Sequence, residues 1–105
     1  MQDRAEYRIA KAFSDRAKAR TGNAGTDGET VYYHHNRIAW RNADGSISFT
    51  LADHPTLTTR RYLNAIHQVL FDTRPFYELK GQVYYSEDVI DRKQVITRHI
   101  LVEAA

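Results

Sequence analysis

The side chains best suited to chemistry in this chain are its five histidines, His34, His35, His54, His67 and His99. His34 and His35 are adjacent, and neighbouring residues of a strand point to opposite faces, so the two would not readily bind one ion. The other three lie on separate predicted elements, and neither an H-x-x-x-H nor an H-E-x-x-H spacing occurs. We therefore expect no metal site, and hydrogen-bonded surface histidines are the favoured interpretation.

Acid–base catalysis would need a histidine beside a carboxylate. The sequence offers Asp53 with His54 and Glu29 with His34, but such pairs work only when burial shifts a pKa. No serine lies in a nucleophile elbow, and the lack of cysteine excludes thiolate catalysis, disulfides and cysteine-ligated zinc. The glycine-rich stretch 22–28 matches neither common phosphate-binding pattern. We therefore predict a protein that is not an enzyme and uses no cofactor.

Positive charge is concentrated at the N-terminal end. Residues 1–20 carry a net charge of +3, whereas the whole chain carries +2. A basic helix of this kind can contact an acidic protein surface or nucleic acid, and a solvated helix face is the plainer alternative. The candidate contacts on this helix are Arg4, Arg8, Lys11 and Lys18.

Aromatic and basic side chains also alternate along the predicted strands. Tyrosine and arginine are common anchors of protein interfaces, and rings beside arginines can also stack on bases. Cross-strand pairs within the core are the alternative. The candidate contact surface on the sheet comprises Tyr32, His34 and Arg41, with Tyr84 as a further candidate, and Arg60 and Arg61 are candidates for phosphate contacts.

These candidates would be carried by an α+β fold. A chain of 105 residues, of which 42% are hydrophobic, is typical of one globular domain. Ala5, Ile9 and Phe13 form a narrow apolar seam that predicts a helix over Asp3–Ala19, ended by the glycine-rich turn. We therefore divide the chain into a basic N-terminal helix, residues 1–20, and a single α+β domain, residues 21–105.

An antiparallel meander is expected next, with strands over 30–34, 37–41 and 46–51. The first connection is a two-residue turn at His35–Asn36 and the second contains Asp44–Gly45. In the second strand, the alternation predicts Ile38 and Trp40 on one face and Ala39 and Arg41 on the other.

A packed amphipathic helix follows the meander, over Thr59–Leu70, with Thr58 or Thr59 as its N-cap. Residues 76–80 and 82–86 predict a further hairpin, residues 87–93 a charged connection, and Gln94–Glu103 a final strand. Because an exposed edge strand can pair across a two-fold axis, a homodimer is possible. No apolar run is long enough to span a bilayer and no signal peptide is visible, so we expect a soluble, cytoplasmic protein.

Three motifs within residues 21–70 resemble a group of small bacteriophage and prophage proteins. They are a G-N-A-x-T-D-G turn at 22–28, a tyrosine-rich hairpin at 32–41 that contains Ile-Ala-Trp, and a P-T-x-T-T-R-x-x-L-N helix start at 55–64. The chain departs from the pattern at His35, where the group usually has glycine.

The resemblance implies a phage context but assigns no functional residue. Small non-enzymatic phage proteins often cover a surface of a host machine, as anti-CRISPR and other anti-defence inhibitors do. On this basis we expect a binding protein that inhibits a bacterial defence complex in the cytoplasm of the host cell. The alternative is a small nucleic-acid-binding phage protein that uses the basic N-terminal helix.

Overall fold

In the computed structural model, which describes residues 4–100, the chain forms an α+β fold of two helices and nine strands. The fold class predicted from the sequence is confirmed. In chain order the elements are α1 (Ala5–Ser14), β1 (Ala19–Thr21), β2 (Ala24–Thr26), β3 (Thr30–Tyr33), β4 (Asn36–Arg41), β5 (Ile47–Thr50), α2 (Leu57–Phe71), β6 (Phe76–Leu79), β7 (Gln82–Tyr85), β8 (Asp88–Val89) and β9 (Val95–Arg98).

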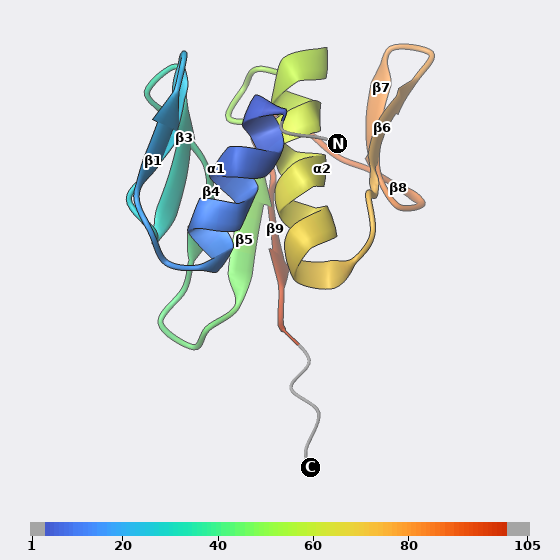
Figure 1. Cartoon of the computed structure of the whole chain (residues 1–105). Coiled ribbons are helices and arrows are strands. Elements are labelled where there is room, and N and C mark those ends of the chain that lie inside the picture. Colours follow the sequence, from blue (N-terminus) through green and yellow to red (C-terminus); the bar gives the residue numbers. More distant parts are fainter. Residues whose placement is uncertain (1–3, 101–105) are drawn as a thin grey trace.

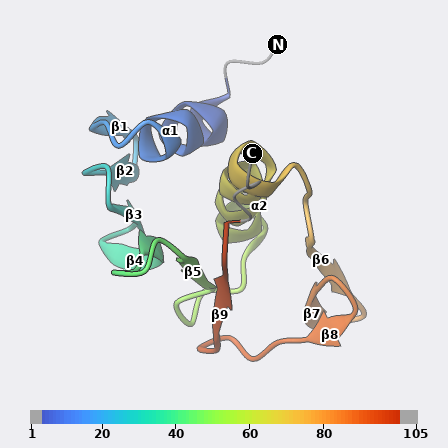
Figure 2. The same ribbon diagram turned by 90° about the horizontal axis from the view of Figure 1, so that it is seen from below.

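The strands form two antiparallel sheets. The larger sheet has the order β1-β2-β3-β4-β5-β9, and the smaller has the order β6-β7-β8. Both helices pack on one face of the larger sheet, and α2 lies between that sheet and the small one (Figures 1 and 2). We call the face of the larger sheet that carries the helices its inner face, and the opposite face its outer face.

One core joins the two helices to the inner face. Ile9 and Phe13 of α1, Leu63 of α2, and Val31 and Phe49 of the sheet are all fully buried in this core. Burying a side chain of this kind contributes about 1.5–3 kcal/mol. The N-terminal helix is therefore part of the folded unit and not a detached arm.

The first helix is shorter than the sequence suggests. It ends at Ser14, although we predicted a helix from Asp3, which lies outside the described residues, to Ala19. Arg16 adopts a left-handed conformation with φ 57°, and the Arg41 guanidinium donates a hydrogen bond of 2.7 Å to the Phe13 carbonyl. A side chain from β4 thus adds a second hydrogen bond to this carbonyl, which also accepts from the Arg16 amide at 3.1 Å, and the chain turns back as the hairpin β1–β2.

The predicted meander is present, with two corrections in its first hairpin. Its turn lies at His34–His35, because both residues have positive φ, as a type I′ turn requires, while Asn36 already pairs with Tyr33. A β-bulge interrupts the pairing between β3 and β4. Val31 opposes Ala39 and Tyr32 opposes Arg37, so Ile38 is the extra residue and both Ile38 and Ala39 are buried.

The second helix is confirmed, but its cap is not the residue that we predicted. Thr56 is the N-cap, and its side-chain oxygen accepts a hydrogen bond from the Thr59 amide. Thr59 cannot serve as the cap because its side chain is fully buried and contacts the Thr56 hydroxyl. The helix ends at Phe71, where Asp72 takes a left-handed conformation.

The elements after α2 agree with the predicted hairpin and final strand. The strands β6 and β7 pair as expected, and the charged connection after them contains the short strand β8. The last strand spans Val95–Arg98 and pairs with β5, while residues 101–103 of the predicted strand lie outside the described residues. Pairing of this edge across a two-fold axis stays a prediction. Neither helix in the described part of the chain is long and apolar enough to cross a membrane.

His67 of α2 is fully buried between the two sheets, where phenylalanine rings of β5, α2 and β6 pack around it. One ring nitrogen, Nδ1, lies 3.0 Å from the Thr73 carbonyl oxygen, and the other, Nε2, lies 3.0 Å from the Tyr85 hydroxyl. Burial lowers the pKa of His67 from its ordinary value of 6.5 to about 4. The ring is therefore a neutral, hydrogen-bonded part of the core.

The backbone approaches itself closely where the β2–β3 turn meets the residues that follow α1. A Cβ atom at Gly28, which has φ +96°, would lie 2.7 Å from the Arg16 carbonyl oxygen. Gly28→Ala should therefore lower the free energy of unfolding by about 2–4 kcal/mol, measured by urea denaturation. Gly45→Ala is the matched control, because Gly45 has a similar φ of +88° but open space around it, and should cost only about 1–2 kcal/mol. Equal losses in the two variants would contradict the contact.

The state of His67 predicts how stability depends on pH. Below pH 6.5 the unfolded chain takes up a proton on this imidazole that the folded protein excludes until about pH 4. The contribution of the neutral His67 ring to the free energy of unfolding should thus be fully present above pH 6.5. It should fall by about 3 kcal/mol as the pH drops to 4. Urea unfolding at several pH values measures this, and His67→Gln should flatten the curve. His54→Gln, which removes an exposed histidine instead, is the control. A His67→Gln protein that loses stability as steeply as the native chain would contradict the neutral ring.

Candidate functional site

A row of residues crosses the outer face of the larger sheet at its β1 edge. In the strand register, Arg20 of β1 opposes Gly25 of β2, Gly25 opposes Tyr32 of β3, and Tyr32 opposes Arg37 of β4. Residues that oppose each other directly share one face of a sheet. The row is therefore arginine, glycine, tyrosine, arginine, with a gap where glycine has no side chain.

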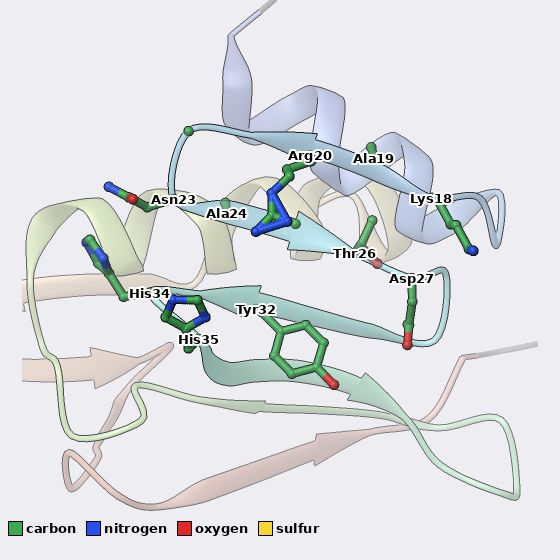
Figure 3. A pocket seen from close by; sticks show the side chains of 12 residues that line it. Lys18, Ala19, Arg20, Asn23, Ala24, Thr26, Asp27, Tyr32, His34 and His35 are labelled. Atoms are coloured by element: carbon green, nitrogen blue, oxygen red, sulfur yellow. The ribbon is translucent and has the colours of Figure 1, made fainter.

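This gap is the centre of an open groove of about 520 Å³. Figure 3 shows Arg20, Tyr32 and His35 projecting from the same side of the strands, with Lys18 and Asp27 near one end and Asn23 and His34 near the other. The full lining is Lys18, Ala19, Arg20, Gly22, Asn23, Ala24, Gly25, Thr26, Asp27, Tyr32, His34 and His35. Cations and an exposed ring thus surround a floor of bare backbone.

Two neighbouring hairpin tips close one end of the groove. The His34 amide donates a hydrogen bond of 2.8 Å to the Asn23 carbonyl, which ties the β3–β4 tip to the β1–β2 tip. The two imidazoles of this turn are therefore held at the rim by positive-φ backbone. The His34 ring also packs edge-on against Tyr33, with 4.3 Å between the ring centroids.

The carboxylate at the opposite end is already used by the backbone. Asp27 Oδ1 accepts hydrogen bonds from the amides of Glu29 at 2.9 Å and Thr30 at 2.8 Å. These two bonds lower the pKa of the Asp27 carboxyl. Asp27 therefore shapes the β2–β3 turn and keeps its negative charge at this end of the groove, near Lys18.

A second, shallower hollow of about 390 Å³ continues the outer face toward β9. Its lining includes Arg37, Trp40, Thr50 and Lys93. The Arg37 guanidinium carbon lies 3.8 Å from the centroid of the Trp40 ring. The bulge at Ile38 makes this contact possible, because it brings residues three apart in the chain onto the same face.

Four cations of the outer face have no acidic partner. Among residues 4–100, Lys18, Arg20, Arg37 and Lys93 form no ion pair within 4.0 Å. The neighbouring carboxylates are occupied, since Glu29 pairs with Arg16 and Arg41, and Asp53 pairs with Arg92. We call these four cations, together with the rings of Tyr32 and Trp40, the cationic band.

The structure places the contact residues that we predicted on several different surfaces. Lys18, Tyr32 and His34 line the groove. Arg4, Arg8 and Lys11 are exposed, but they belong to the α1 region on the opposite side of the sheet (Figure 2). Arg61 is exposed on α2, in the same helical layer.

Two predicted contact arginines instead serve the fold. The Arg41 side chain is only 7% exposed, lies over the Phe13 ring and caps the α1 carbonyl end. Arg41 thus points inward, whereas we predicted it on the polar face. Arg60 is 13% exposed and forms an ion pair of 3.0 Å with Glu78 of the small sheet. Tyr84 lies on the small sheet and stacks on Tyr77, so it is not part of the surface around Tyr32.

Sequence reasoning missed the β1–β2 side of the groove apart from Lys18, because it placed residues 15–20 in a helix and 21–28 in a turn. The Gly22–Asn23 pair was the available signal, since such a pair between short strands marks a two-residue hairpin. Ala and Gly give these strands little β propensity, so Arg20 and Gly25 were not assigned to a sheet. Arg37 and Trp40 were missed as a pair because alternation alone puts them on opposite faces.

The arrangement does not present an acid–base pair in the groove. His67, the fully buried histidine, contacts a carbonyl and a hydroxyl and lies in the core. Within residues 4–100, no three His, Cys, Asp or Glu side chains lie close enough together to hold a metal ion. What the outer face offers is attraction for anions and stacking on rings. No known protein family, curated protein or solved structure matches the chain.

Proposed function

We propose that this protein is a non-enzymatic binding protein that holds a single strand of nucleic acid on the outer face of its larger sheet. The observation that carries the proposal is the cationic band, in which four cations with no ion pair among residues 4–100 flank the rings of Tyr32 and Trp40. Proteins that bind single strands combine cations along the backbone path with rings on which bases stack.

The extent of the band suits a polymeric anion. It reaches from Lys18, before β1, to Lys93, before β9, and six strands placed about 4.8 Å apart span about 24 Å. A row of four cations suits the regularly spaced charges of a phosphate backbone, although Asp27 and Asp53 also line the two hollows. Ion pairs with arginines offset the charges of Glu29 and Asp53, whereas Asp27 remains a carboxylate at one end of the groove.

The sequence alone suggested that nucleic acid would contact the N-terminal helix. The contact surface proposed here is the outer face of the larger sheet instead. Of the four contact residues predicted on that helix, only Lys18 takes part, because it lines the groove. The resemblance to bacteriophage and prophage proteins favours action in the cytoplasm of a bacterial host cell.

The salt dependence of binding tests this function. With four phosphate contacts and a slope of about −0.7 per contact, a plot of log K against log salt should have a slope of about −3. The measurement is fluorescence anisotropy of a labelled oligothymidylate of about ten nucleotides, in about 50 to about 300 mM sodium chloride. Arg20→Ala and Lys93→Ala should each reduce the magnitude of the slope by about 0.7.

Arg8→Ala is the matched control for these variants, because Arg8 is an exposed arginine on the other side of the sheet. It should leave both the affinity and the slope unchanged. Loss of slope in Arg8→Ala with none in Arg20→Ala would return the contact to the helix and contradict the outer face. No binding of the oligothymidylate at low salt would overturn the function.

A second candidate function is supported by a different surface. The outward row of the small sheet consists of Tyr77, Tyr84 and Val89, in which Tyr77 and Val89 are 43% and 53% exposed, with Leu79 also exposed. The rings of Tyr77 and Tyr84 stack in parallel, with 5.1 Å between centroids. Exposed tyrosine and aliphatic side chains are typical interface anchors, and they support an inhibitor that covers a surface of a bacterial defence complex, as an anti-CRISPR does.

Affinity purification from a bacterial host lysate, with and without nuclease, distinguishes the two candidates. The nucleic-acid function predicts recovery of nucleic acid that is lost on digestion and reduced by Arg20→Ala. The inhibitor function predicts a stoichiometric protein partner that survives nuclease and is lost on Tyr77→Ser. A partner that survives nuclease and is retained by Tyr77→Ser would argue against the small-sheet surface.

A further inference from the structure

Gly25 occupies the one position in the cross-strand row where a side chain would close the groove. Its neighbours in the row are Arg20 on β1 and Tyr32 on β3. A Cβ atom at Gly25 would meet only the Ala19 carbonyl oxygen at 3.4 Å and the Arg20 Cγ at 3.9 Å. No side chain of β2 itself therefore covers the backbone at this point, although the Arg20 side chain passes close to it (Figure 3).

The walls of this opening are a guanidinium on one side and a phenol ring on the other. Tyr32 is 40% exposed and Arg20 is exposed, so a phenol ring and a positive charge are accessible to an incoming group. Arginine and tyrosine are also the side chains on which nucleobases stack in single-strand complexes. A phosphate alone would use the cations but neither the ring nor the flat floor.

The geometry points to a base pocket: one unstacked nucleobase inserts beside Gly25, between the Arg20 side chain and the Tyr32 ring, while Lys18 and the N–H edge of the Arg20 guanidinium contact the flanking phosphates. The inference rests on the proposed function and adds to it the place where a base is held. Since every base has a π-face, such a pocket binds bases with little sequence preference.

The Ile38 bulge sets the direction in which the bound nucleic acid continues beyond the pocket. Next to Tyr32 along the row lies Arg37, which covers Trp40. A nucleic-acid strand whose base occupies the pocket would therefore continue across β3 and β4, over the Arg37 guanidinium that lies on the Trp40 ring. This places the phosphates of the next nucleotides within the cationic band.

Three variants test the pocket, with binding of the labelled oligothymidylate as the measurement. Tyr32→Ala should weaken binding roughly 5- to 100-fold without changing the salt slope, because it removes stacking and no phosphate contact. Tyr32→Phe keeps the ring and should bind like the native protein. Gly25→Ala, whose added methyl fits the strand, should weaken binding by obstructing the floor.

The controls separate stacking from damage to the fold. Tyr77→Ala removes a tyrosine of similar exposure, 43%, from the small sheet and should leave binding unchanged. An oligothymidylate with abasic positions should bind the native protein more weakly, and Tyr32→Ala should be less sensitive to the abasic positions. Urea unfolding verifies that each variant is folded.

The results that would overturn the base pocket differ from those that would overturn the proposed function. If the oligothymidylate binds with a slope of about −3 but Tyr32→Ala and Gly25→Ala bind like the native protein, the base pocket is wrong and the proposed function stands. If the native protein does not bind the oligothymidylate, the function itself fails. Weaker binding of Tyr32→Ala accompanied by a reduced salt slope would also overturn the pocket.

Discussion

Burial of α2 on several sides is the constraint on which the rest of the structure depends. Leu63, Ala65 and Ile66 are all fully buried, and α1 lies beside them. The helix-facing side of each sheet packs against α2, so the outer face of the larger sheet takes no part in the packing around the helices. The protein can therefore vary the polar and aromatic side chains of that face without altering the core.

Three local backbone features turn this free face into a groove with a particular chemistry. The His34–His35 turn brings two imidazoles to the rim, Gly25 leaves the floor open, and the bulge at Ile38 turns Trp40 outward beneath Arg37. The ion pairs of the nearby carboxylates leave the cations of the band unpaired among residues 4–100. Attraction of an anionic, flat ligand follows from backbone geometry and charge together.

Much of the fold follows from the sequence, because strong periodicity marks α2 and β5. The clean alternation of Ile47 and Phe49 with polar residues predicted a strand correctly, although Ser48 is buried as well. The candidate site was predictable only in part. No local pattern shows that Arg41 turns inward to cap α1 or that a bulge at Ile38 reverses the alternation, since both depend on tertiary contacts.

The most direct test of the account is to map the contact surface on the intact protein. Titration of ¹⁵N-labelled protein with the oligothymidylate, followed by two-dimensional NMR, reports on each amide and on the indole N–H of Trp40. The account predicts the largest changes at Gly25, at Tyr32 and at the Trp40 indole, on one face of the larger sheet. Changes centred on Tyr77 and Tyr84, or on Arg8 and Lys11, would contradict it.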